Sequence, residues 1–451
     1  MIESDDLVAR LGLANARAQA RWPGDSAARQ PVHTVYGGAH LFRHDTAVRL
    51  GAAARRTIEE YAPASSDLGR VLGLPDKTSR EIYDRVVQKL AREPVEDYRL
   101  DFEDGYGTRP DGEEDGHAVS AAEEMARGAA CAGLPPFIGI RVKPLTQELT
   151  DRSLRTTRLF LQTLLDRTGN RLPGRFVLTL PKITSADQVA VFAEYCARLE
   201  RSRGLLPGGL KLELMIETPQ SILDERGAPA LPSLVAAGAG RITGAHFGTY
   251  DYTASLGVTA AHQHMRHPAC DFARHVMQVS LAGTGIWLSD GATNVLPVPV
   301  HRAAEGTVLD EAAREANRAA VHRAWRLHFD DVRHSLVNGF YQGWDLHPAQ
   351  LVTRYAAVFA FFLESLDAAS ERLRNFIARA AQATLVGEVF DDAATGQGLL
   401  NFFLRALNCG AVIDSEIGGL TGLSVEELRS GSFVKIVRGR VREGPGPQPS
   451  V

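Results

Sequence analysis

Short apolar runs alternate with longer stretches of helical spacing over most of this chain. The apolar runs have the length and the continuous hydrophobicity of parallel strands that are buried on both faces. The eight runs are Val32–Tyr36, Tyr98–Phe102, Phe137–Val142, Phe176–Leu180, Lys211–Ile216, Ile242–Phe247, Gly285–Leu288 and a weaker one near Tyr341–Leu346. Two of the intervening stretches, Ser185–Leu199 and Glu311–Phe329, are predicted helices, and Ser185 is placed to cap the first.

Eight strand–helix units are typical of a (β/α)8 TIM barrel, and we expect this α/β fold. An open, doubly wound sheet is the alternative. That fold usually carries a glycine-rich phosphate turn after its first strand, for which the Gly37-Gly38 pair is a weak substitute.

The pattern changes to mostly helical beyond residue 350, where Gln350–Ala381 and Gly396–Leu407 are the predicted helices. We therefore expect an N-terminal helical segment over 1–30, the barrel over 31–350 and a C-terminal helical extension over 351–440. The Gly- and Pro-rich residues 441–451 are predicted to form a disordered tail. Thr108–Gly116, rich in Gly, Pro and acidic residues, is predicted to be an exposed loop.

Charge and composition exclude several functional classes. The chain has 451 residues, a net charge of −4 and a pI near 6.4, which argues against a nucleic-acid partner. No run approaches about 20 uninterrupted apolar residues, so we expect no membrane span, and the acidic N-terminus lacks a secretion signal. The scattered cysteines, Cys131, Cys196, Cys270 and Cys409, are predicted to be reduced core thiols of a cytoplasmic protein.

Two carboxylates point to an enzyme. Glu217 follows the predicted fifth strand and Asp251 follows the sixth, each at the end of an apolar run. A carboxylate at the end of a buried strand is costly unless something pairs with it. Oxygen ligands on neighbouring strands suit a hard cation, so we predict that Glu217 and Asp251 bind Mg²⁺ or Mn²⁺. The simpler alternative is that the two acids cap the helices that follow.

Further polar clusters fall at the same ends of the predicted strands, where barrel enzymes place their sites. They include Glu103 and Asp104 after the second strand, Arg141 at the third, Lys182 after the fourth, Asp290 after the seventh and His347 after the eighth. Arg141 could instead form a buried salt bridge with Glu103 or Asp104. Lys182 is more simply paired with a neighbouring carboxylate than used as a Schiff-base lysine.

The histidines leave alternatives open. His262, His264 and His267 fit an irregular loop better than a zinc site, and His347 is expected to be structural. His246 could face either the barrel interior or the helix layer.

The order of six motifs resembles the superfamily of citrate lyase β-subunits, malyl-CoA lyases and 2-oxo acid aldolases, and more distantly the malate synthases. The motifs are DFEDG at 101–105, IRV at 140–142, LPK at 180–182, IET at 216–218, FGTYDYTASLG at 247–257 and DLHPAQ at 345–350. The resemblance covers about Val32 to Gln350.

This resemblance implies a Mg²⁺-dependent carbon–carbon lyase that acts on a small 2-oxo or 2-hydroxy acid through a metal-stabilised enolate. Glu217 and Asp251 match the metal ligands, and Arg141 matches the arginine that holds the 2-oxo acid. Glu103 and Asp104 match an acidic pair beneath the metal, while Gly248 and the backbone of Thr249 match the turn beside the substrate carboxylate. Use of a coenzyme A thioester stays open, and the relatives suggest a homo-oligomer.

The general acid or base is not fixed by the sequence. Glu388, Asp391, Asp392 and Asp290 are the candidates. Two other functions remain as alternatives: a malate-synthase-like condensation with an acyl-CoA, and a catalytically silent barrel that acts as a partner subunit or a ligand sensor.

Overall fold

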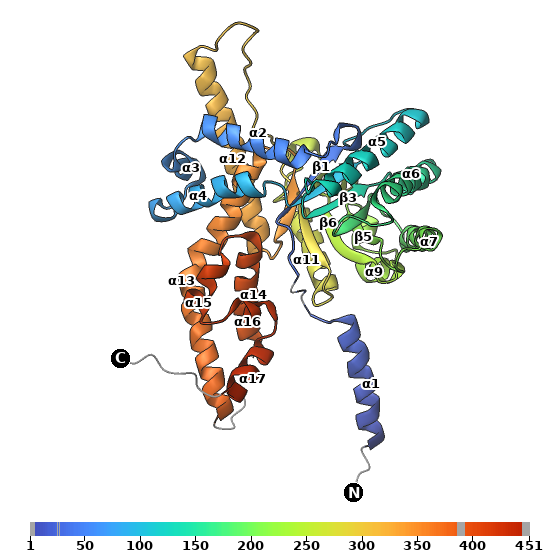
Figure 1. Ribbon diagram of the computed structural model, residues 1–451, viewed down its shortest axis with the longest axis vertical. Coiled ribbons are helices and arrows are strands. Elements are labelled where there is room, and N and C mark those ends of the chain that lie inside the picture. Colours follow the sequence, from blue (N-terminus) through green and yellow to red (C-terminus); the bar gives the residue numbers. More distant parts are fainter. Residues whose placement is uncertain (1–4, 25, 27, 386–392, 444–451) are drawn as a thin grey trace.

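Eight parallel strands close into a barrel in the computed structural model, which describes residues 5–24, 26, 28–385 and 393–443 (Figure 1). Each strand pairs with its sequence neighbours, and β8 pairs with β1 to complete the ring. The strands are β1 (His33–Gly38), β2 (Asp97–Asp101), β3 (Phe137–Arg141), β4 (Phe176–Leu180), β5 (Lys211–Ile216), β6 (Ile242–Phe247), β7 (Trp287–Ala292) and β8 (Gln342–Asp345). All eight predicted strands are therefore confirmed, as is the (β/α)8 fold.

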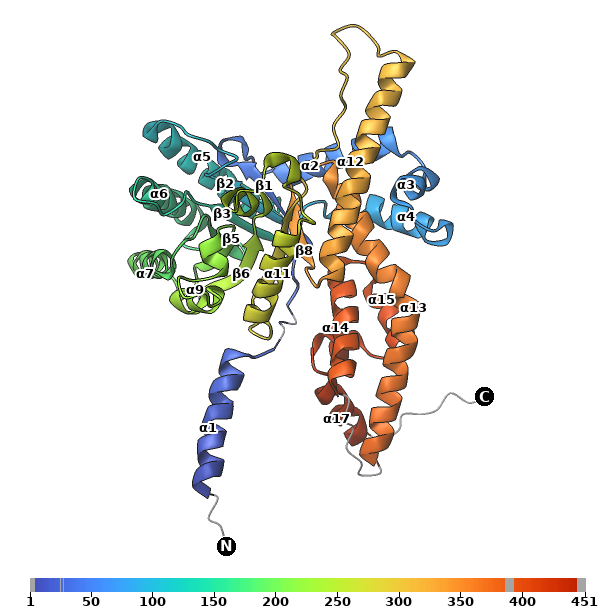
Figure 2. The ribbon, with the colours of Figure 1, turned by 180° about the vertical axis from the view of Figure 1, so that it is seen from behind.

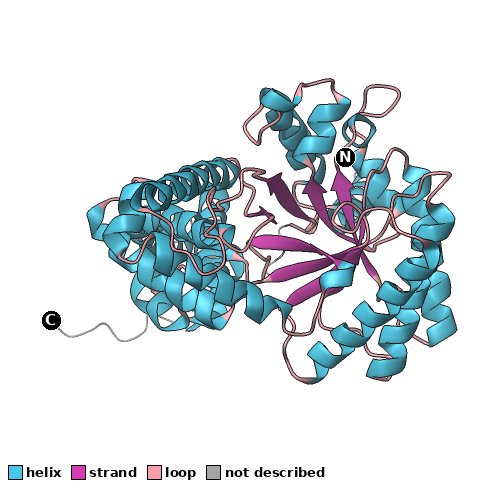
Figure 3. Cartoon of the chain, turned by 90° about the horizontal axis from the view of Figure 1, so that it is seen from above, coloured by secondary structure: helices cyan, strands magenta, loops and turns pink. Residues whose placement is uncertain are grey.

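Helices surround the barrel and bury their apolar faces against it (Figures 1 and 3). Three of them separate β1 from β2, namely α2 (Thr46–Tyr61), α3 (Ser65–Leu72) and α4 (Asp76–Arg92). The others are α5 (Asp111–Ala130), α6 (Thr150–Thr168), α7 (Ala186–Arg203), α8 (Pro219–Ile222), α9 (Leu231–Ala237), α10 (Thr249–Ser255), α11 (Pro268–Leu281) and α12 (Glu311–Val337). Because all eight strands are parallel, their carboxyl ends lie together at one mouth of the barrel.

The long helix α13 (Gln350–Leu385) connects the barrel to a second group of helices. Its first half is almost entirely buried and packs on α4 and α12, as the last helix of the barrel. Farther along it packs on α14 (Ala393–Cys409), α15 (Asp414–Thr421) and α17 (Phe433–Glu443), and α16 (Val425–Arg429) packs on α14. This C-terminal group lies beside the barrel (Figures 2 and 3).

The N-terminal helix α1 (Asp5–Arg21) extends away from the rest of the molecule (Figures 1 and 2). Leu7, Val8, Leu11 and Leu13 on this helix are 53–67% exposed. No helix among the described residues is both long enough and apolar enough to cross a membrane.

Two local predictions were wrong and one was confirmed. The expected loop Thr108–Gly116 ends early, because α5 begins at Asp111 after Pro110 fixes the preceding turn. Ser185 occupies the N-cap position of α7 as predicted, in a capping box in which Gln188 Oε1 accepts the Ser185 amide at 3.3 Å. Cys131 is exposed, since it lies just beyond the last turn of α5, whereas the other three cysteines are buried as predicted.

The interior of the barrel is ionic at its centre, where branched apolar side chains are usual. Arg99 on β2 reaches across to Glu213 on β5, with Nη2 donating to Oε1 at 2.6 Å and Nε to Oε2 at 3.1 Å. The same guanidinium pairs with Asp97. Asp97 accepts from Thr34 at 2.8 Å, and Thr34 accepts from Gln342 at 2.9 Å. These bonds join strands on opposite sides of the barrel and form a floor beneath its mouth.

Candidate active site at the carboxyl ends of the strands

Glu217 lies at the end of β5, with 1% of its surface exposed. Its Oε1 accepts the backbone amide of Lys182 at 2.7 Å. Burial raises the pKa of Glu217 to about 7, although Lys182 and Arg141 partly oppose that shift and Asp251 adds to it. The positive charges of Lys182 and Arg141 therefore do not fully compensate for the loss of hydration of the ionised Glu217 carboxylate.

Lys182 connects the carboxylates of the mouth. Its Nζ lies 2.6 Å from Glu103 Oε1, 3.3 Å from Asp104 Oδ1 and 3.5 Å from Asp251 Oδ2. The residue follows Pro181 and has a φ of +49°, a left-handed conformation that costs a non-glycine residue about 1 kcal/mol. This conformation presents its amide to Glu217 and its ammonium to the other acids. The expected carboxylate pairing of Lys182 is confirmed by these contacts.

Arg141 is held mainly by an acid that the sequence did not single out. Nε donates to Asp101 Oδ1 at 2.8 Å and Nη2 to Oδ2 at 2.5 Å, so one edge of the guanidinium is fully used. Its remaining nitrogen, Nη1, lies 3.1 Å from Glu103 Oε2 and 3.5 Å from Asp104 Oδ2. The ring of Tyr36 lies 4.9 Å below the guanidinium carbon. Nη1 thus turns toward the acidic cluster.

Glu103 and Asp104 have opposite environments although they are adjacent. The Glu103 side chain is 7% exposed, and burial raises its pKa to about 7 despite the nearby charge of Arg141. The Asp104 side chain is 58% exposed. Burial works against its ionised form, but its bonds to Glu103, Arg141 and Lys182 outweigh that and lower its pKa. At neutral pH, Glu103 can therefore hold a proton while Asp104 stays ionised.

Gly248 allows β6 to end against Glu217. A Cβ at this position would lie 2.5 Å from Glu217 Cβ and 2.6 Å from Oε2. The chain then enters α10, whose first turn contains Asp251. Thr249 is buried, and its hydroxyl donates to Met265 Sδ at 3.0 Å, in the turn before α11. Any contact of Thr249 with a substrate would have to come from its backbone.

The donor set fits a hard divalent cation. Glu217 and Asp251 offer oxygen atoms only, and both contact Lys182. Because burial raises the pKa of Glu217, a bound cation would stabilise its ionised form. Two carboxylates leave most coordination positions of Mg²⁺ to water or substrate, as this ion requires. Among the described residues no group of three or more His, Cys, Asp or Glu side chains has a metal-binding arrangement, so a closed cage is not formed there.

Other expected candidates face away from the mouth. Asp290 is fully buried and accepts from Arg274 at 2.9 Å and from Ser335 at 2.6 Å, so its carboxylate points to α11 and α12. His246 faces the barrel interior, 3.5 Å from Glu213. His347 accepts the Ala349 amide at 3.2 Å in a structural turn, as expected. Three further candidates lie outside the described residues: Glu388, Asp391 and Asp392.

The histidines His262, His264 and His267 lie in the irregular segment between α10 and α11, as the sequence predicted. His262 ends a short 3₁₀ turn, and the rings of His264 and His267 are 5.8 Å apart. His267 is the N-cap of α11 and accepts the Ala269 amide at 3.1 Å.

Comparison with protein families assigns most of the chain to one group. The sequence model described as a domain of unknown function, DUF6986, matches residues 11–436. The chain belongs to the DUF6986 family. No protein with a curated description matches it.

Several solved structures are similar to this DUF6986 protein at low identity, and the first of them shares its fold. A citrate lyase from Burkholderia xenovorans LB400 is 18% identical, with a TM-score of 0.52 over 88% of this chain and 99% of the other. A malate synthase from Haloferax volcanii is 16% identical, with a TM-score of 0.43 over 72% and 69% of the two chains. An HpcH/HpaI aldolase/citrate lyase family protein from Burkholderia cenocepacia J2315 is 14% identical, with a TM-score of 0.38 over 75% and 95%.

Sequence reasoning missed two features of the DUF6986 site. Asp101 was part of a quoted motif, and pairing of β2 with β3 sets it beside Arg141, a register that no single-sequence pattern reveals. Tyr36 supports the guanidinium from below and stacks on Trp344 at 4.7 Å between ring centres. The sequence signal for Tyr36 was its place on the first strand, where side chains alternate between the two faces and Tyr36 points to the opposite face from Val35.

Proposed function

We propose that this protein is a Mg²⁺-dependent carbon–carbon lyase that acts on a small 2-oxo or 2-hydroxy acid. One observation carries the proposal: Lys182 gathers Glu103, Asp104, Asp251 and, through its amide, Glu217 at the end of the barrel where Arg141 also lies. Charged side chains converging on one point of a barrel mouth, with buried carboxyl groups among them, are typical of catalytic sites. The fold shared with a citrate lyase is consistent with this activity.

The reaction has simple requirements. In the cleavage direction a substrate hydroxyl loses its proton and becomes a carbonyl as the adjacent carbon–carbon bond breaks. The electron pair of that bond moves into the 2-oxo acid fragment, where the carbonyl oxygen takes the negative charge until a proton reaches the carbon. Mg²⁺ held by Glu217 and Asp251 would supply Lewis-acid stabilisation of that charge.

The side chains of the mouth supply the rest. Arg141 Nη1 and Lys182 Nζ are preorganised donors, because Asp101 and Glu103 fix their positions before substrate binds. Glu103 can retain a proton on its carboxyl group at neutral pH, which suits it to donate or accept one during turnover. Gly248 lets the turn after β6 pass directly against Glu217, which would bring the backbone of that turn beside the substrate carboxylate.

Proton exchange into pyruvate tests this function without knowledge of the second substrate. The purified chain, with Mg²⁺ and pyruvate in D₂O, should replace the methyl protons of pyruvate with deuterium, as followed by ¹H NMR. Glu217→Gln and Asp251→Asn should each slow the exchange by about 10²-fold or more, because each removes a charge that holds the cation. A chelator should have the same effect on the unaltered chain.

Glu225→Gln is the matched control, since Glu225 is an exposed carboxylate on the loop after β5, and its exchange rate should equal that of the unaltered chain. Equal rates in Glu217→Gln, Asp251→Asn and the control would contradict the metal assignment. Thiol release from acetyl-CoA with glyoxylate, in the absence of pyruvate exchange, would contradict the lyase in favour of an acyl-CoA condensation.

A further inference from the structure

The side chain of Tyr36 lies inside the barrel between two separate ion-pair networks. Its hydroxyl donates to Met215 Sδ at 3.8 Å, so the side chain reaches from β1 toward β5 on the other side of the ring of strands. On the mouth side, the guanidinium carbon of Arg141 lies 4.9 Å from the centre of its aromatic ring. On the other side is the ionic floor, which Thr34 joins two positions earlier on β1 through its bond to Asp97. Tyr36 therefore stands between Arg141 and the floor.

A second aromatic side chain holds Tyr36 in place. Trp344, on β8, lies 4.7 Å from it between ring centres, with 37° between the two planes. Trp344 faces inward, because the next residue, Asp345, points outward to His328 and Arg354. Burial raises the pKa of the Tyr36 hydroxyl well above its usual range, so this group keeps its proton at neutral pH. Tyr36 thus presents a fixed and neutral aromatic face.

The contact with this face complements the hold of Asp101 on Arg141. Two parallel bonds to one carboxylate fix an edge of the guanidinium, but they leave its plane free to tilt about that edge. The Tyr36 ring beneath the plane limits the tilt toward the floor. The tilt decides where Nη1 points, and this nitrogen lies 3.1 Å from Glu103 in the mouth. A smaller side chain at position 36 would give the guanidinium room to turn down.

We propose that Tyr36 is a positioning residue, which fixes the tilt of the Arg141 guanidinium and so directs Nη1 at the carboxylate of a bound 2-oxo acid. The inference rests on the proposed function, because it requires that Arg141 binds the substrate. The aromatic ring has this role and the hydroxyl does not, since the hydroxyl reaches only the weak acceptor Met215 Sδ. Trp344 acts one step farther away, by holding the ring of Tyr36.

Pyruvate exchange in D₂O with Mg²⁺ tests this role through paired substitutions. Tyr36→Phe keeps the ring and should exchange within about twofold of the unaltered chain, whereas Tyr36→Leu should be slower by about tenfold or more. In an Arg141→Lys background, Tyr36→Leu should cause no further loss, because an ammonium has no plane for the ring to orient. Equal rates for Tyr36→Phe and Tyr36→Leu would overturn the proposal, as would the same loss from Tyr36→Leu in both backgrounds.

Phe137→Leu is the matched control. Phe137 is at the start of β3, with the guanidinium carbon of Arg175 4.7 Å from its ring centre, and it contacts Trp287 at 5.9 Å between ring centres. It therefore repeats the arrangement of Tyr36 at the other end of the barrel. Phe137→Leu should exchange within about twofold of the unaltered chain. An equal loss in Phe137→Leu and Tyr36→Leu would mean that only packing was affected, which would overturn the proposal.

A crystal structure of Tyr36→Leu separates this inference from the proposed function. It should retain the bonds between Arg141 and Asp101 and show Nη1 displaced by about 1 Å or more from its place beside Glu103. An unmoved guanidinium would overturn the positioning role even if the unaltered chain exchanges pyruvate. Absence of exchange in the unaltered chain would instead reject the proposed function, and the position of Arg141 would then decide the inference. If circular dichroism shows that Tyr36→Leu is not folded, Trp344→Leu replaces it, with the same displacement expected.

Discussion

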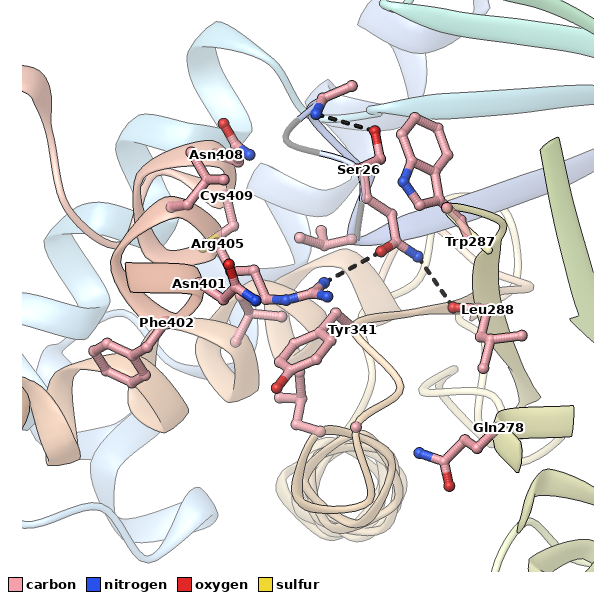
Figure 4. Close-up of a pocket in the computed structure, with 18 of the residues that line it drawn as sticks. Ser26, Gln278, Trp287, Leu288, Tyr341, Asn401, Phe402, Arg405, Asn408 and Cys409 are labelled. Atoms are coloured by element: carbon pink, nitrogen blue, oxygen red, sulfur yellow. Dashed lines mark hydrogen bonds between the residues drawn. The ribbon is translucent and has the colours of Figure 1, made fainter. Parts of the chain in front are cut away.

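The two ends of the barrel differ in the kinds of side chain that line them. At the carboxyl ends of the strands, five acids each lie close to Lys182 or Arg141: Asp101, Glu103, Asp104, Glu217 and Asp251. At the amino ends of β7 and β8 lies a cavity of about 550 Å³, lined mainly by apolar and aromatic side chains (Figure 4). The comparison teaches that a cavity alone does not mark a catalytic site, and that the end with shifted pKa values is where chemistry is expected.

The largest effect is expected at Arg141, which can be compared with Arg241. Each arginine makes a two-bond ion pair with a buried carboxylate, Arg141 at the carboxyl end of the barrel and Arg241 at the amino end. Arg141→Lys should reduce pyruvate exchange about 10²- to 10³-fold, because an ammonium cannot satisfy Asp101 with two bonds and still present a donor to the mouth. The control is Arg241→Lys, which breaks an equally buried two-bond pair with Glu200 just before β6. Arg241→Lys should lower stability and leave exchange unchanged; equal loss in both variants would show that only folding was affected.

The barrel interior, which separates the two ends, should be the next most sensitive region. Arg99→Met leaves Asp97 and Glu213 as uncompensated buried charges and should cost about 3–5 kcal/mol in the free energy of unfolding, measured with urea. Arg99→Met combined with Glu213→Gln should recover part of that loss. A cost under about 1 kcal/mol for the single change would mean that the interior is hydrated and screened.

The pH dependence of stability should distinguish the mouth from the rest. The pKa of Glu217 is about 7 in the folded chain and about 4.5 when unfolded, so the folded state holds its proton more tightly. In metal-free protein, stability is therefore full below about pH 4.5 and falls as pH rises to about 7, by roughly 3 kcal/mol.

Comparison of Glu217→Gln with the unaltered chain isolates this contribution. The variant should be the more stable of the two at pH 8, and the difference should vanish near pH 4.5. Saturating Mg²⁺ should remove the advantage of the variant at pH 8, because the cation binds the ionised carboxylate. Parallel stability curves for the two proteins would contradict the shifted pKa.

The smallest effect is expected from α1, which leaves the molecule below the barrel. Deletion of residues 1–21 should change the free energy of unfolding by less than about 0.5 kcal/mol, because almost every side chain of this helix is exposed. Urea unfolding of the full and the shortened chain measures the difference, and a loss of more than about 1 kcal/mol would mean that α1 packs on the rest of the molecule.

Much of this architecture was predictable because it depends on local patterns. The strands were recognised from apolar runs, and Glu217, Asp251 and Arg141 from their places at strand ends, since parallel topology brings those ends together. What could not be predicted depends on contacts between distant residues. The hold of Asp101 on Arg141, the left-handed turn at Lys182 and the paired charges of Arg99 and Glu213 each need the strand register. The cavity at the amino ends of β7 and β8 needs the packing of α14 against the barrel.

The ionic floor of the barrel limits how this protein can change over time. Arg99 and Glu213 come from strands on opposite sides of the ring, more than a hundred residues apart in the chain. Losing Arg99 leaves Glu213 and Asp97 without their shared counter-charge in a medium of low polarity, so a lineage that replaces Arg99 must also neutralise Glu213. Relatives of this chain should therefore carry the two residues as a linked pair, either both present or both exchanged for neutral side chains.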